Sequence, residues 1–135
     1  QSASSYGEWQ EQVLSSKKDG FQAVIVSNYA ALKGNKGKVI PLDEVSEWTG
    51  KYSPIPVFAF WGYSVGKGKA IGGLLISGEH QGRDAAKKVN EFLITGTLSR
   101  ISIPQRGSLV FSKHELKRWD IELPNRMSQR ARFVD

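Results

Sequence analysis

Three residues that follow a predicted buried strand offer the clearest binding chemistry in this sequence: Trp61, Gly62 and Tyr63. The strand is predicted at residues 57–60, where four apolar residues follow one another. Trp61 supplies a flat face for stacking and an indole N–H donor, although a tryptophan serves equally well in a core. In open α/β sheets, ligands bind beyond the carboxyl ends of the strands. We therefore interpret this turn as an edge that binds a small molecule.

Phosphate-binding and dinucleotide-binding motifs are suggested just after this turn, but both lack essential parts. A phosphate loop needs four residues between its first glycine and the Gly-Lys pair, and then Ser or Thr. Here three residues separate Gly62 from Gly66, and Gly68 takes the place of the hydroxyl residue. The glycines lead into a predicted strand and not into a helix whose N-terminus could hold a pyrophosphate. We predict no cofactor.

The residues that could support catalysis or metal binding are also sparse. His80 and His114 are the two histidines, and neither has a second metal ligand at helical spacing. Glu79 and Asp84 flank His80, but carboxylates in the first turn of a helix usually complement its dipole. No G-x-S-x-G nucleophile motif occurs. The sequence therefore predicts no catalytic residue, no metal site and no enzymatic activity.

Composition narrows the class of protein further. The 135 residues suffice for one domain, and a hydrophobic content of 39% with a charged content of 24% is typical of a globular protein. The chain has no cysteine, which excludes disulfides and thiolate chemistry. The net charge of +6 raises nucleic acid as a partner. The positive residues are scattered over loops and the C-terminus, however, so we expect no nucleic-acid partner.

The elements that must position the binding edge alternate along the chain, which predicts a three-layer α/β fold with a parallel sheet and helices on both faces. Capping boxes at Ser5 and Ser112 predict helix starts. Apolar residues spaced for one helix face, with Gly96 as the C-cap, predict a helix before residue 96. Strands are predicted at residues 21–27, 57–60, 74–76 and 109–111, with an extended stretch at 101–103. Residues 24–26 and 57–59 should be neighbouring parallel strands, and residues 125–135 should form a peripheral tail.

Several motifs in this order resemble a known family. They are SNYA at residues 27–30, IPVF at 55–58, GRDAA opening a helix at 82–86, GSLVF at 107–111 and a closing Leu-Pro at 123–124. The arrangement resembles the C-terminal half of ABC-transporter solute-binding proteins whose relatives recognise aromatic amino acids. The resemblance spans nearly all of residues 5–124 and implies the type I periplasmic-binding-protein fold. It also implies that ligand binds between two α/β lobes, of which this chain would hold part, and the start at Gln1 fits an excised piece or a mature product.

The family's ligand contacts come from turns after the strands, so the resemblance implies a set of binding residues. The matching positions are Ser27, Asn28, Tyr29, Trp61, Gly62, Tyr63 and Ser64. Trp61 and Tyr63 stand where relatives often carry small hydroxyl residues, which leaves the identity of the ligand open. Asn28 is equally suited to a tight turn, because asparagine tolerates a left-handed backbone.

Two classes of function compete at this point. The first is a solute-binding component of an ABC transporter, or an exported sensor domain of the same fold, which would bind a small organic ligand without chemistry. Its partners would be a membrane permease or a sensor kinase, in a periplasmic or extracellular location, and exposed lobe-facing surface would favour a homodimer. The alternative is a cytoplasmic nucleotide-binding or regulatory α/β domain.

Overall fold

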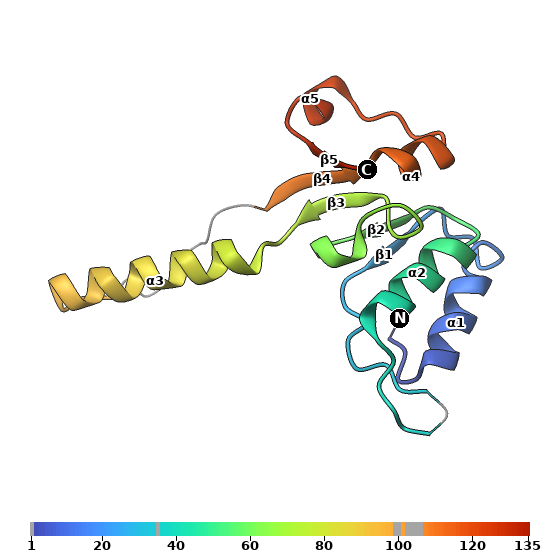
Figure 1. The fold of residues 1–135 in the computed structure, drawn as a ribbon, viewed down its shortest axis with the longest axis horizontal. Coiled ribbons are helices and arrows are strands. Elements are labelled where there is room, and N and C mark those ends of the chain that lie inside the picture. The colour runs from blue at the N-terminus through green and yellow to red at the C-terminus, as the bar shows by residue number, and fades with distance from the viewer. Residues whose placement is uncertain (1, 35, 99–100, 102–106) are drawn as a thin grey trace.

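The computed structural model describes residues 2–34, 36–98, 101 and 107–135. Within these residues the chain forms a mixed α/β fold that contains a parallel pair of strands and a separate three-stranded sheet (Figure 1). A long helix, α3, extends away from the body that the other elements form. No helix in the described part of the chain combines the length and apolar character needed to span a membrane.

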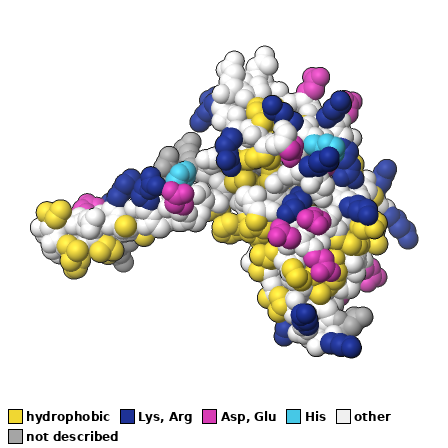
Figure 2. All heavy atoms as spheres, in the orientation of Figure 1, with side chains coloured by type: hydrophobic (Ala, Val, Ile, Leu, Met, Phe, Trp, Pro, Cys, Tyr) yellow, Lys and Arg dark blue, Asp and Glu magenta, His cyan; other side chains and the backbone are white. Residues whose placement is uncertain are grey.

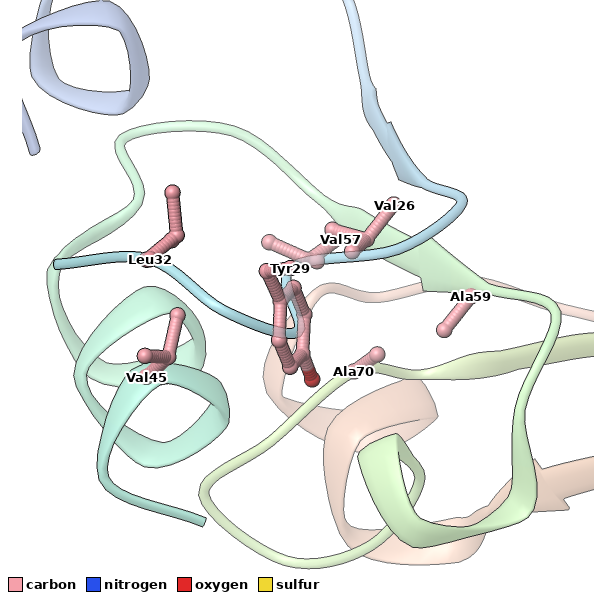
Figure 3. Packing of buried hydrophobic residues seen from close by; sticks show 7 residues of the cluster. All are labelled: Val26, Tyr29, Leu32, Val45, Val57, Ala59 and Ala70. Atoms are coloured by element: carbon pink, nitrogen blue, oxygen red, sulfur yellow. The ribbon is translucent and has the colours of Figure 1, made fainter. Parts of the chain in front are cut away.

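The first sheet is the predicted pair of parallel strands. β1 (Val24–Val26) pairs with β2 (Val57–Ala59) so that Val24 lies opposite Val57 and Val26 opposite Ala59. Two helices, α1 (Tyr6–Ser15) and α2 (Leu42–Tyr52), accompany this pair. Their core is shown in Figure 3 and consists of Val26, Tyr29, Leu32, Val45, Val57, Ala59 and Ala70. The prediction of neighbouring parallel strands at these residues is confirmed.

The second sheet has the order β3-β4-β5. β4 (Ser108–Ser112) runs antiparallel to β3 (Gly72–Leu75) and parallel to β5 (Arg132–Val134). The helices α4 (Lys113–Arg118) and α5 (Asn125–Ser128) belong to the same part of the chain. Ile71, Phe111 and Leu116 form its core, and Met127 and Phe133 pack against them. The C-terminal segment that was predicted to be peripheral is therefore integrated, because β5 adds a strand and the segment contributes apolar side chains.

The two sheets adjoin through β2 and the residues around β3. The amide of Ile71 donates to the carbonyl of Val57 at 2.8 Å, and the amide of Ile76 donates to the carbonyl of Phe60 at 2.9 Å. A Cβ atom on Gly73 would lie 2.7 Å from the carbonyl oxygen of Ala59. Glycine at this position therefore lets the chain pass close to β2. The one-turn 3-10 helix η1 (Gly62–Ser64) follows β2 and leads to this contact.

The helix α3 (Gly78–Thr95) forms where its local sequence signals predict. The side chain of Ser77 caps its N-terminus, and Gly96 ends it in the left-handed conformation with φ 67°. None of its residues is buried, including the predicted apolar face of Ala85, Val89, Phe92 and Leu93. Figure 2 shows hydrophobic side chains gathered along one edge and the far end of this helix, with charged side chains on the other edge. The helix is confirmed, but no described element covers its apolar face.

The prediction of one three-layer parallel sheet is wrong for the described residues. β3 and β4 are antiparallel, and the parallel pair β1–β2 is a separate sheet. Residues 21–27 were predicted to form one strand of that sheet, but the strand is limited to Val24–Val26, and Ile25 is 65% exposed. Alternating helices and strands establish the class but not which strands pair, because pairing depends on contacts between distant segments.

Smaller differences concern element ends and one outlying stretch. Ser5 caps α1 as predicted, with its hydroxyl accepting from the amide of Glu8, but Leu14 is exposed. The helix α2 begins after Pro41, and no side-chain hydrogen bond caps its N-terminus. Ser112 caps α4 as predicted. The extended stretch predicted at residues 101–103 lies mostly outside the described residues.

Candidate functional site

The parallel pairing of β1 and β2 brings the two predicted binding turns to one edge. Both strands end at this edge, so residues 27–29 and 61–64 follow them side by side. The indole Nε1 of Trp61 donates a hydrogen bond of 2.6 Å to the carbonyl of Ser27. The rings of Tyr29 and Tyr63 meet edge to face with centroids 6.2 Å apart. The sequence reasoning therefore identified residues that the fold places together.

These residues divide into a buried support and an exposed rim. Tyr29 and Ser64 are buried, Trp61 is half-buried, and Ser27, Asn28, Gly62 and Tyr63 are exposed. Tyr29 belongs to the core of the first sheet, and Figure 3 shows its ring among the aliphatic side chains of that core. Direct ligand contact is therefore open to the exposed residues, while Tyr29 and Ser64 hold the turn from below.

Asn28 has a local structural partner. Its side-chain oxygen accepts a hydrogen bond of 2.8 Å from the amide of Ala30. This is the geometry of an Asx turn, in which the side chain substitutes for a backbone turn contact. The structure thus supplies a turn-forming role for Asn28, and nothing in it requires a ligand to explain this residue.

Tyr29 is a buried phenol with the hydroxyl groups of Ser64 and Ser46 beside it. Removal from solvent raises the pKa of its phenol, and hydrogen bonds with Ser64 and Ser46 oppose that rise. The phenol is therefore neutral at physiological pH and is held by two hydroxyl groups. This supports a positioning role beneath the rim, and the phenol supplies no charge to a ligand.

A hollow of about 530 Å³ lies beside the exposed part of this edge. Three predicted residues, Trp61, Gly62 and Tyr63, form one side of it. The remaining described lining comes from the end of β3, the start of α3 and the second sheet: Leu75, Ile76, Ser77, Gly78, His80, Ser108, Val110 and Arg132. The hollow therefore lies where the two sheets and the long helix meet.

Sequence reasoning missed most of the far side of this hollow. The sequence predicts no catalytic or metal-binding role for His80 and places Arg132 in a peripheral tail. Arg132 reaches the hollow because β5 pairs with β4, with Arg132 opposite Val110. The alternation of apolar and polar residues at 131–133 is the one local signal for that strand, and it is too short to identify a partner strand.

Two other hollows in the described part of the molecule are less suited to a ligand. One of about 200 Å³ lies between α1 and the start of β1 and is lined mainly by apolar residues that include Trp9 and Val13. The second, of about 410 Å³, contains the buried carboxylate of Glu115. That carboxylate accepts from the amide of Gly68 at 2.8 Å and from Nη1 of Arg118 at 3.0 Å. Its hydrogen bonds tie protein segments together, so the second hollow is best explained as part of the framework.

Among the described residues, no three His, Cys, Asp or Glu side chains converge into a group that could hold a metal ion. Comparisons of the chain with protein-family models, with curated proteins and with solved structures found no match.

Proposed function

We propose that this protein binds a small organic solute, without transforming it, in the hollow beside Trp61. The observation that carries the proposal is the place of the hollow at the carboxyl edge of the parallel pair β1–β2. Ligand sites of α/β proteins favour such edges. The volume of about 530 Å³ also lies within the range that small-molecule sites occupy.

The contacts of Trp61 support a binding role. Its indole N–H already donates to the carbonyl of Ser27, which holds the ring against the end of β1. The ring face is then the part that offers a ligand stacking and apolar contact. Tyr63 lies next to it on η1, is exposed, and is braced by the buried ring of Tyr29. A preorganised aromatic rim of this kind binds at low entropic cost.

The biological setting of the proposal comes from the family resemblance. We propose that the chain is part of a type I periplasmic-binding-protein-like protein, exported from the cytoplasm, that passes its solute to a membrane permease or signals through a sensor kinase. The mixed α/β composition and the parallel β1–β2 pair are compatible with this setting. The sequence motifs at residues 82–86 and 107–111 are its main support.

A thermal-shift screen with aromatic acids, amino acids, sugars and nucleotides, followed by calorimetry, tests the proposal. Binding of at least one small solute should be lost or weakened more than tenfold by Trp61→Ala and by Tyr63→Ala, since each removes an aromatic face. Tyr52→Ala is the matched control, because Tyr52 is an exposed tyrosine on α2 that does not line the hollow. Solute binding that is indifferent to both variants at the hollow would contradict the proposal.

A further inference from the structure

The charges around the hollow are one-sided. Arg132 and His80 are among its described lining residues, which include no aspartate or glutamate. Glu79 is the nearest carboxylate in sequence, but it forms an ion pair with Arg83 at 2.7 Å and is not among the lining residues. A ligand in the hollow therefore meets positive charge and hydrogen-bond donors, with no described carboxylate to receive an ammonium group.

Arg132 is held in place by strand pairing and has unused binding capacity. The parallel register places it opposite Val110, a buried residue of the central strand β4. Within the described residues, no carboxylate lies within ion-pair distance of its guanidinium. An arginine presents two parallel N–H donors in the geometry that a carboxylate accepts. Arg132 is therefore available to pair with an anionic ligand group.

A second arginine reinforces the same rim. An adjoining hollow of about 530 Å³ shares Ser108 and Arg132 with the first and also contains Arg130. Arg130 likewise has no carboxylate partner in the part of the chain that the structure describes. Two neighbouring unpaired guanidinium groups repel cations and raise the local concentration of anions.

The N-terminus of α3 also adds positive charge beside the hollow. Ser77 and Gly78 line the hollow, and they lie at the N-terminus of an 18-residue helix. The unpaired amides at such an end carry partial positive charge. This contribution is secondary to that of Arg132, but it has the same sign and faces the same space.

We propose that the solute is an organic anion with a planar apolar body, held by Arg132 at one end and by Trp61 at the other. This inference rests on the proposed function. The class is that of aromatic or heteroaromatic carboxylates. A zwitterion such as an amino acid fits less well, because its ammonium group would lie in a positively charged site without a counter-charge. Arg132 is accordingly the residue that determines specificity for charge.

Three probes of one shape test this inference: benzoate, benzamide and benzylammonium, titrated at neutral pH and low salt while NMR shifts of the protein are followed. We expect benzoate to bind about tenfold more tightly than benzamide, and benzylammonium more weakly than either. Arg132→Gln should reduce benzoate affinity to about that of benzamide and change benzamide affinity much less. Arg132→Lys should restore part of the preference, and Arg126→Gln is the control, since Arg126 does not line the hollow.

The outcomes separate this inference from the proposed function. Equal binding of benzoate and benzamide, or a preference that survives Arg132→Gln, overturns charge selection by Arg132. If benzamide binding is at the same time lost in Trp61→Ala, the proposed solute site stands without the inference. If no probe binds in a way that depends on Trp61, the inference is overturned. The proposed function is overturned as well if the wider solute screen also finds no binding that depends on Trp61. Far-ultraviolet circular dichroism of each variant verifies that it is folded.

Discussion

The helices α2 and α3 are both amphipathic, but only α2 buries residues against the rest of the protein. α2 has 11 residues and buries Val45, Ser46, Thr49 and Gly50 against the first sheet and the loop before β3. α3 has 18 residues, a capped N-terminus and a left-handed C-cap, and buries none of them. The longer helix with the clearer end signals therefore has the fewer tertiary contacts.

This contrast shows that the formation of a helix depends on local sequence signals, whereas its packing against the rest of the protein depends on distant segments. Caps, spacing and glycine at the C-terminus act within a few residues, so the sequence alone reveals them. Burial of the apolar face depends on which other segments lie nearby. In α3 the apolar face has no described partner, and the expectation that such a surface leads to dimerisation stays a prediction.

The largest effect should come from removing the buried carboxylate that joins α4 to the loop before β3. Glu115→Ala leaves the amide of Gly68 without its acceptor and removes the carboxylate from Arg118, whose Nη1 keeps its hydrogen bond to the carbonyl of Gly50. We expect a loss of about 4 kcal/mol in the free energy of unfolding, measured by urea denaturation. Glu91→Ala on α3 is the matched control, because its exposed ion pair with Lys88 should contribute less than about 0.5 kcal/mol. Equal losses in the two variants would contradict the distinction between body and α3.

The same glycine substitution should change stability in opposite directions in the two helices. A Cβ on Gly50 of α2 would meet Lys69 Cα at 2.6 Å and its carbonyl oxygen at 2.7 Å, whereas one on Gly82 of α3 meets nothing within 4 Å. We expect Gly50→Ala to destabilise the protein by about 3 kcal/mol. Gly82→Ala should raise the helicity of α3, since alanine is favoured over glycine by about 1 kcal/mol in a helix. Circular dichroism and urea denaturation measure the two changes, and destabilisation by Gly82→Ala would indicate that α3 packs against something.

A smaller effect should separate two valines. Val45 on α2 is fully buried, and Val89 on α3 is 56% exposed. Val45→Ala should cost about 2 kcal/mol, from the lost apolar burial and the cavity left behind. Val89→Ala should change the free energy of unfolding by less than about 0.5 kcal/mol. A cost for Val89→Ala that grows with protein concentration would instead reveal an association through α3.

The residues of the binding edge were the part of the site that could be predicted from sequence patterns. Trp61 and Ser27 each follow an apolar strand, and parallel strands bring their carboxyl ends together, so a local pattern and one general rule placed these residues side by side. The opposite side of the hollow was not accessible in this way. The position of Arg132 beside the hollow depends on the pairing of β5 with β4. This pairing joins segments about twenty residues apart through three residues of each strand.

The sequence by itself determined the helix starts at Ser5 and Ser112, the end of α3 at Gly96 and the neighbouring strands β1 and β2. These features depend on hydrogen bonds and apolar spacing within a few residues. Only the tertiary structure decided that the strands form two sheets, that the C-terminal segment joins the second, and that α3 leaves its apolar face uncovered. Those outcomes depend on long-range pairing and burial, whose free energy depends on where distant residues meet and not on any one segment.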